Sequence, residues 1–297
     1  MKNKKIGNIL LYLLIKLFAL LTRIVPFFIF KHIIGYLAIL ASHLLKQYNP
    51  IAKKNYEIIY GTSLSQKTAI RNVQKIYKSF GLQILEDFYM ANNRYPYSAL
   101  IDQISGLHYL LNAHKKGKGV IILSAHIGNF TQISIVLNSL GLNNNKTIMR
   151  SVKNPYIESY FSKLRGKLGI KWFNESKTKK SPLQILRFLK KEKGLLVLLI
   201  DQRYQKGIKV KFFGLDKKTA VGPAVLALKT SAAVIPMFST RTNNNNNRLF
   251  IEKPVEIINT GNYENDIVLN TQHFTNILES YTAKFPKQWF ALNRWWR

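Results

Sequence analysis

Short apolar runs without polar interruptions alternate along the chain with stretches that show helical spacing of apolar residues. Residues 120–123 and 194–200 are almost entirely aliphatic, which is typical of strands buried on both faces. Shorter apolar runs at 146–149 and 232–238 fit the same description. Because helical segments lie between these runs, the pattern predicts an α/β fold: a mixed, largely parallel sheet flanked by helices.

The remaining pattern predicts the helices and the connections. A polar asparagine run, 243–247, predicts an exposed turn before a late strand at 249–255. Residues 93–105 read as a connector. Helical spacing of apolar residues, ended in places by glycine, predicts helices at 53–92, 107–116, 129–140, 156–168, 183–193 and 273–285.

The first 45 residues are set apart by their hydrophobicity. Two apolar stretches, 6–22 and 27–45, are separated at Pro26, and each approaches the roughly 20 residues needed to cross a hydrocarbon core. The basic bias of this region favours the cytoplasmic side of a membrane. We therefore expect a membrane anchor or a pair of interfacial helices over 1–45, followed by one domain over 46–297. The alternative is a buried amphipathic helix of a soluble protein.

Composition limits the classes of partner. The net charge is +31, from 45 Lys and Arg against 14 Asp and Glu, which favours an anionic membrane surface, acidic substrates or nucleic acid. Nucleic acid is disfavoured because the chain lacks a recognisable binding module and carries an apolar segment. The absence of cysteine excludes disulfides and a thiolate nucleophile. With no P-loop and no dinucleotide fingerprint, no metal or other cofactor is expected.

Chemically active residues follow the predicted strands. His126 comes just after the run at 120–123, and Asp201 directly follows the run at 194–200. Arg150 and Arg241 occupy similar positions after two other runs. Because the carboxyl ends of parallel strands meet at one edge of a sheet, these side chains are expected to converge there. A histidine at that edge can act as a general base, although a structural histidine bonded to a backbone group is the alternative.

Several segments together resemble the bacterial lipid A late acyltransferases, the lauroyl/myristoyl acyltransferase family. The resemblance covers most of 45–297, and its order and spacing make it specific. It is carried by SAHIGNF at 124–130, DQRY at 201–204, VKFFG at 210–214, TAVGPAVLAL at 219–228, VIP at 234–236, QWF at 288–290 and NRW at 293–295.

The resemblance implies a glycerolipid-acyltransferase-like fold and a reaction. A fatty acyl chain would pass from acyl carrier protein to a hydroxyl of a phosphorylated glycolipid, a lipid A precursor, at the cytoplasmic face of the bacterial inner membrane. It implies that His126 is the general base and that Asp201 supports catalysis. The candidate substrate-binding residues are Asn129, Arg150, Arg203 and Arg241.

One position departs from the family motif, in which an acid follows the histidine after four residues. Here that position is Thr131, which supplies no charge to orient an imidazole. Either Asp201 or Glu86 is expected to replace the missing acid, and Asp201 is favoured. Thr131 therefore stands among the candidate catalytic residues.

Two other functions stay open. The first is a different acyltransferase, with another glycolipid or a phospholipid as the acceptor and with acyl-CoA as an alternative donor. The second is a catalytically silent relative that binds lipid or a carrier protein, which the threonine at position 131 makes plausible.

Overall fold

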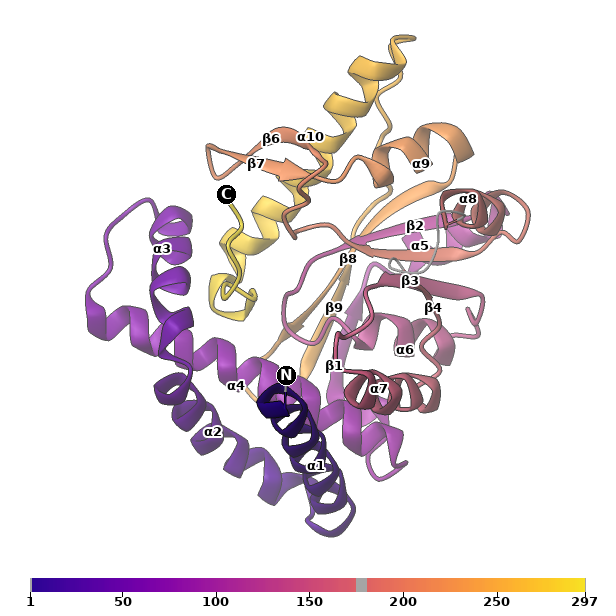
Figure 1. Ribbon diagram of the computed structural model, residues 1–297. Helices are drawn as coiled ribbons and strands as arrows, with labels where there is room; N and C mark the ends of the chain where they lie inside the picture. Colours follow the sequence, from indigo (N-terminus) through magenta and orange to yellow (C-terminus); the bar gives the residue numbers. More distant parts are fainter. Residues whose placement is uncertain (1, 175–180, 297) are drawn as a thin grey trace.

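The computed structural model describes residues 2–174 and 181–296. Within these residues, a sheet of seven strands has the order β1-β9-β8-β2-β5-β3-β4, and a separate hairpin pairs β6 with β7 (Figure 1). The predicted fold class, a mixed and mostly parallel sheet flanked by helices, is confirmed. The strands are β1 Ile101–Ser105, β2 Val120–Ser124, β3 Asn145–Met149, β4 Trp172–Asn174, β5 Leu195–Leu199, β6 Ile208–Phe212, β7 Leu215–Thr219, β8 Ala233–Arg241 and β9 Asn247–Ile251.

The four strands predicted from the apolar runs form the centre of the sheet. β2 pairs in parallel with β5 on one side and β8 on the other, and β3 pairs in parallel with β5. Their carboxyl ends therefore lie along one edge. β9 returns antiparallel to β8, which makes the sheet mixed.

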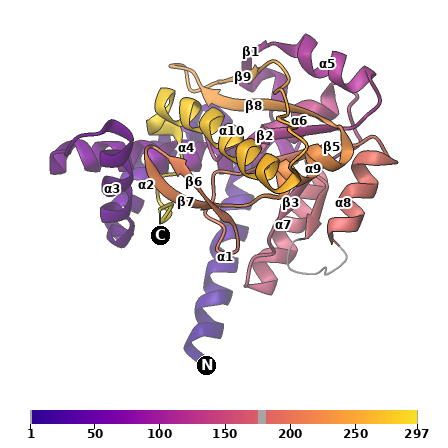
Figure 2. The ribbon, with the colours of Figure 1, turned by 90° about the horizontal axis from the view of Figure 1, so that it is seen from above.

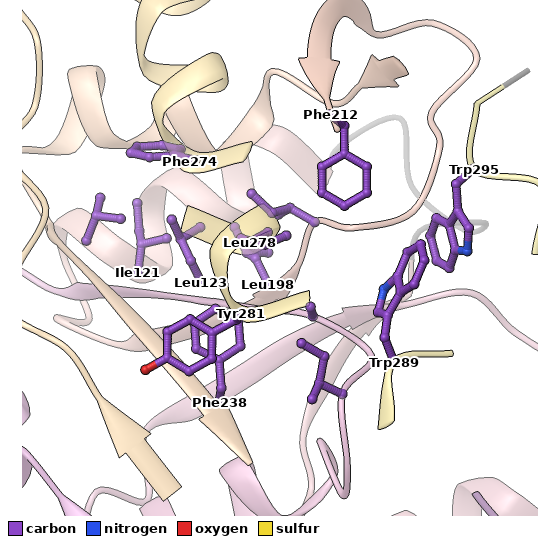
Figure 3. Packing of buried hydrophobic residues seen from close by; sticks show 14 of the residues in the cluster. Ile121, Leu123, Leu198, Phe212, Phe238, Phe274, Leu278, Tyr281, Trp289 and Trp295 are labelled. Atoms are coloured by element: carbon purple, nitrogen blue, oxygen red, sulfur yellow. The ribbon is translucent and has the colours of Figure 1, made fainter. Parts of the chain in front are cut away.

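Side chains of β2 show how both faces of the sheet are covered. Ile121 and Leu123 pack in a cluster with α8 Ser181–Lys190, α9 Gly222–Thr230 and α10 Tyr263–Lys284. Figure 3 shows Phe274 and Leu278 of α10 within this layer. Val120 and Ile122 point to the opposite face, toward α5 Leu107–Lys115 and α6 Gln132–Ser139. A strand buried on both faces explains the uninterrupted aliphatic run.

The long helical pattern at 53–92 is divided into two helices, α3 Asn49–Tyr60 and α4 Gln66–Ala91. Gly61, with φ of 64°, ends α3 in the left-handed conformation that glycine adopts without strain. Ser65 then caps α4 by accepting a hydrogen bond from the backbone N–H of Thr68. This break gives α4 its own direction along the edge of the sheet (Figure 1).

Two apolar helices, α1 Lys2–Ile24 and α2 Phe27–Leu44, begin the chain and meet at Pro26. Both are long and apolar enough to cross a membrane, and only 11% and 28% of their apolar windows is buried. Figure 2 shows α1 projecting away from the rest of the molecule. These helices fit the membrane-associated segment that the sequence predicts. α2 also packs on α4 through Phe27 and Phe30 against Leu85 and Tyr89, so 27–44 shares a hydrophobic cluster with the domain that follows.

Several boundaries differ from the predictions. The expected connector at 93–105 contains a 3₁₀ turn, Tyr97–Leu100, and the edge strand β1, whose polar Asp102 and Gln103 hide a strand pattern. The helix expected at 129–140 begins only at Gln132, and the late helix α10 begins ten residues before 273. α7, Pro155–Lys167, lies close to its predicted limits.

Candidate active site

The turn after β2 brings His126 to the edge of the sheet. Gly128 has φ of 55°, and a Cβ atom there would lie 2.4 Å from the carbonyl oxygen of Ser239 in β8. Only glycine allows this close passage. The turn is also tied to the C-terminal segment, because Gly128 N–H donates to Gln288 O at 3.1 Å and Phe290 N–H donates to His126 O at 2.9 Å.

His126 and Asp201 form a hydrogen-bonded pair. The imidazole Nδ1 lies 2.8 Å from Asp201 Oδ1, and the backbone N–H of His126 donates to Oδ2 at 3.1 Å. Trp289 Nε1–H donates to the same Oδ2 at 2.9 Å. The carboxylate is therefore fully buried yet accepts three hydrogen bonds, which compensates for its desolvation.

The environment of Asp201 favours its ionised form. Burial alone would raise the pKa of Asp201, but the charge and hydrogen bond of His126, with Lys217 and Trp289, outweigh it and hold the pKa below its ordinary value. An ionised carboxylate only accepts hydrogen bonds, so Nδ1 of His126 is the protonated nitrogen. When the ring is neutral, the lone pair is then on Nε2.

His126 lines a small pocket, and its Nε2 atom has one polar neighbour. Gln202 Nε2 lies 3.3 Å from it and can donate a hydrogen bond to the lone pair. The imidazole is 18% exposed and packs edge-to-face on Phe130, with ring centroids 4.7 Å apart. Ser79, Phe80, Gln83, Gln288 and Phe290 are among the other residues that line the pocket. The arrangement places the imidazole of His126 in the lining of this pocket.

Behind this turn lies a polar cluster that joins β8, the β2–α6 turn and α4. Arg241 and Glu86 form a bidentate ion pair, with Nη1–Oε1 at 2.7 Å and Nη2–Oε2 at 3.1 Å. Asn129 Nδ2 donates to Glu86 Oε2 at 2.6 Å. The Thr131 hydroxyl lies 2.5 Å from Asn129 Oδ1 and 2.8 Å from Asp87 Oδ1. Thr131 therefore links the turn to α4. The hydrogen-bond partners of its hydroxyl group are Asn129 and Asp87.

The four candidate substrate-binding residues fall into two groups. Asn129 and Arg241 form hydrogen bonds within the protein, in the cluster around Glu86. Arg150 directly follows β3 and is exposed, and Arg203 follows β5 and is partly exposed. The structure thus brings His126 and Asp201 together, while only the arginines at 150 and 203 lie where a ligand in solution can reach them.

Sequence reasoning missed a buried lysine whose charge acts on Asp201. Lys217, on β7, is fully buried, and its Nζ lies 4.4 Å from the centroid of Phe212 and 5.9 Å from that of Trp295. Burial lowers the pKa of Lys217 to about 8, against the opposing attraction of Asp201. Figure 3 shows Phe212, Trp289 and Trp295 gathered in this part of the core.

Trp289 and Asp87 were also assigned no role from the sequence. The only signal for Trp289 was its place in the C-terminal motif, because a contact with a residue 88 positions away leaves no local pattern. Asp87 follows Glu86 in a helical stretch, where a carboxylate normally faces solvent. In residues 2–174 and 181–296, no three His, Asp or Glu side chains gather in a way that could hold a metal ion.

Comparisons with known proteins identify the family. The model of the bacterial lipid A biosynthesis acyltransferase family matches residues 2–297. The chain is also similar to a phosphatidylinositol mannoside acyltransferase of Mycobacterium tuberculosis, with 27% identity over 134 residues. That match covers 45% of this chain and 42% of the length of the relative. Since the family match spans almost every residue, the chain belongs to the bacterial lipid A biosynthesis acyltransferase family and is an acyltransferase.

Proposed function

We propose that this enzyme transfers a fatty acyl chain from acyl carrier protein to a hydroxyl group of a lipid A precursor, with His126 as the general base. The observation that carries the proposal is the 2.8 Å contact between Nδ1 of His126, a residue that lines the pocket, and Asp201, which leaves the basic lone pair on Nε2. The family supports the coarser statement that the acceptor is a lipid A-type or related glycolipid.

The chemistry balances without an added reagent. Nε2 of His126 removes the proton of the acceptor hydroxyl while that oxygen attacks the thioester carbonyl. The new C–O bond forms, the C–S bond breaks, and the imidazolium returns its proton to the leaving thiolate. Asp201 stabilises the imidazolium between these steps because its carboxylate is ionised and bonded to Nδ1.

Charge and exposure support the choice of substrates. A chain with a net charge of +31 attracts an acidic carrier protein and a phosphorylated glycolipid. Arg150 and Arg203, at the ends of adjacent strands β3 and β5, are the proposed ligands of acceptor phosphate groups, because guanidinium groups bind phosphate in a bidentate manner. Asn129 and Arg241 stabilise the turn from inside.

The apolar helices α1 and α2 support a location at the membrane. Acceptor glycolipids of this type lie in an anionic leaflet, and the Lys and Arg residues of the first 60 positions would contact it. The proposal places the enzyme at the cytoplasmic face of the bacterial inner membrane, where an acyl donor carried by a soluble protein is present.

A second acceptor follows from the mycobacterial relative, whose name assigns it a phosphatidylinositol mannoside. A mannose-bearing phospholipid shares the two properties that the site would recognise, namely a free hydroxyl and a phosphate. The lipid A-type acceptor is favoured because the family match covers residues 2–297, whereas the similarity to the relative covers 45% of the chain.

The test uses the detergent-purified full chain, acyl carrier protein or coenzyme A loaded with acyl chains of mixed length, and two acceptors. These are a Kdo-bearing tetraacyl lipid A precursor and phosphatidylinositol mannoside, followed by mass spectrometry. A mass gain of one acyl chain on the lipid A precursor, lost in His126→Ala and kept in His108→Ala, supports the proposal; His108 is an exposed histidine outside the site. Acylation of the mannoside alone, or equal turnover in His126→Ala, would contradict it.

A further inference from the structure

The Thr131 hydroxyl lies between two oxygen atoms that both act as acceptors in their ordinary states. Its Oγ1 is 2.8 Å from Asp87 Oδ1 and 2.5 Å from Asn129 Oδ1. A hydroxyl group carries one proton and can satisfy only one of these contacts. Two oxygens at such distances with no proton between them repel each other, so the geometry requires a second proton.

The orientation of Asn129 is fixed by its other partner. Its amide nitrogen lies 2.6 Å from Glu86 Oε2, and Glu86 is ionised in a bidentate pair with Arg241 whose side chains are 0% and 6% exposed. Rotating the amide by 180° would place its oxygen against this carboxylate. The amide oxygen therefore faces Thr131, and it cannot carry the missing proton.

We propose that Asp87 is a protonated carboxylic acid and the first donor of a relay that runs from Asp87 to Thr131, Asn129 and Glu86. In this arrangement each group donates to the next: the carboxylic acid to the hydroxyl, the hydroxyl to the amide oxygen, and the amide nitrogen to the ionised carboxylate. Each of these contacts then has one proton, and the relay ends on the Glu86–Arg241 pair.

The relay makes Asp87 a positioning residue for His126. It holds residues 129 and 131, and the residue between them, Phe130, packs its ring against the imidazole at 4.7 Å between centroids. This step rests on the proposed function, because it takes His126 as the base. A relay that fixes both neighbours of Phe130 limits the positions open to the imidazole.

The surroundings of Asp87 agree with a neutral acid. Desolvation raises the pKa of Asp87 to about 8; the Thr131 contact and Arg241 on β8 oppose this rise, and Glu86 on the same helix adds to it. From the neighbouring helix α2, Lys31 interacts with Glu86 and Arg241. The relay is therefore expected to lose its first donor as the pH rises through about 8.

Two pairs of variants separate the relay from simple packing. Asp87→Asn keeps a donor at this position without a titrating proton, whereas Asp87→Leu removes the donor. Thr131→Ser keeps the hydroxyl, and Thr131→Val removes it at similar volume. We expect kcat of the asparagine and serine variants to stay within a few-fold of wild type, and kcat of the leucine and valine variants to fall about tenfold or more, the equivalent of one lost hydrogen bond.

The pH profile and an infrared spectrum provide the decisive readouts. The wild-type protein should show the carbonyl stretch of a protonated carboxylic acid that disappears above about pH 8, and Asp87→Asn should lack this band. The alkaline loss of kcat should be smaller in Asp87→Asn than in wild type. Lys217 also titrates near 8, but its electrostatic partner is Asp201 and it is retained in this variant, so the difference reports Asp87.

The control is Asp216→Asn, which changes an exposed aspartate of the hairpin. It should alter neither the pH profile of kcat nor the infrared band. An Asp87 band of an ionised carboxylate at neutral pH, or an asparagine variant as impaired as the leucine variant, would overturn the proposal. Infrared bands do not depend on acyl transfer. If no acceptor is acylated, the proposed function fails, but the infrared spectrum still shows whether Asp87 is protonated.

Discussion

His126 and Asp201, which are 75 positions apart in the chain, meet with Nδ1 and Oδ1 at 2.8 Å. Asp201→Asn tests what this contact does. An asparagine that turns its amide nitrogen to Nδ1 selects the tautomer in which Nε2 carries the proton, and that tautomer cannot act as a base. We expect kcat to fall by a factor on the order of 10³ to 10⁴ with a smaller change in KM, measured by steady-state acyl transfer.

Unfolding measurements distinguish a loss of catalysis in Asp201→Asn from a loss of folding. Asparagine has nearly the shape of aspartate and can still accept from Trp289 Nε1–H, so the variant should remain folded. Near wild-type kcat in Asp201→Asn would mean that the carboxylate is a structural group rather than the partner of a catalytic base.

Thr131→Glu restores an acid at the motif position but should not activate the enzyme. The new carboxylate would lie next to Asp87 and close to Glu86, in a cluster that already holds its charges with a single arginine. We expect lower thermal stability and lower kcat for the single variant. Adding Asp87→Thr, which puts a hydroxyl opposite the new acid, should recover part of both losses in melting and turnover experiments. Activation by Thr131→Glu alone would contradict this prediction and show that an acid at position 131 can still support His126.

Gly128→Ala should damage both folding and catalysis. Its φ of 55° is strained for alanine, and the added Cβ would lie 2.4 Å from Ser239 O. Gly117, with φ of 62° and no atom within 4 Å, provides a matched control that introduces the backbone strain without the clash. We expect a loss of roughly 1–3 kcal/mol in the free energy of unfolding for Gly128→Ala. Chemical denaturation should show a clearly smaller loss of unfolding free energy for Gly117→Ala. Equal losses in the two variants would show that the close approach of Gly128 to Ser239 O does not contribute to stability.

Lys217→Met should make the protein more stable at neutral pH. Burial lowers the pKa of Lys217 from 10.5 to about 8, so below pH 8 the folded protein carries a buried ammonium that the unfolded chain holds in water. Between about 8 and 10.5 the unfolded chain binds a proton that the folded protein does not, and stability should rise with pH by about 1.4 kcal/mol per unit. Denaturation at several pH values should show this rise in wild type and not in Lys217→Met.

Lys211→Met, at an exposed lysine of the same hairpin, is the reference for that comparison. A Lys217→Met variant less stable than wild type at neutral pH would show that the ammonium gains more from Asp201 and the Phe212 ring than it loses on burial.

Leu14→Lys combined with Leu17→Lys should weaken membrane attachment. Both side chains of α1 are more than half exposed, at 54% and 53%, so the change leaves the packing of α1 on α4 intact. Each lysine at the centre of a membrane-inserted helix costs a few kcal/mol. Fractionation of cells should move the variant from the membrane toward the soluble fraction, whereas Leu14→Ile with Leu17→Ile should stay in the membrane. Unchanged distribution of the lysine variant would place the attachment elsewhere.

The sheet could be predicted because its central strands are buried on both faces, and this burial leaves continuous aliphatic runs such as 120–123. The same logic predicts that His126 and Asp201 lie at one edge, since each follows such a run. Edge strands such as β1, which contain exposed and partly buried residues and no fully buried ones, carry no comparable signal. Helix limits depended on caps such as Gly61 and Ser65 within one continuous helical pattern.

The contents of the site could be predicted only in part. Trp289, Lys217 and Asp87 reach the site from the C-terminal segment, the hairpin and α4, and their roles depend on contacts between distant elements. Arg241 illustrates the opposite case: its place at the end of β8 suggested a substrate ligand, but the guanidinium is paired with Glu86 on α4. A position at the end of a strand does not reveal whether a neighbouring helix already supplies a partner.

The C-terminal segment has a consequence for how the enzyme acquires activity during synthesis. Gln288 and Phe290 bond to the backbone of the turn, and Trp289 bonds to Asp201, so the pair assembled by β2 and β5 remains incomplete until this stretch has been synthesised and has folded onto the turn. A partly synthesised chain would thus be unable to consume acyl donor. Fusion partners or truncations near Trp289 are expected to silence the protein while leaving it attached to the membrane.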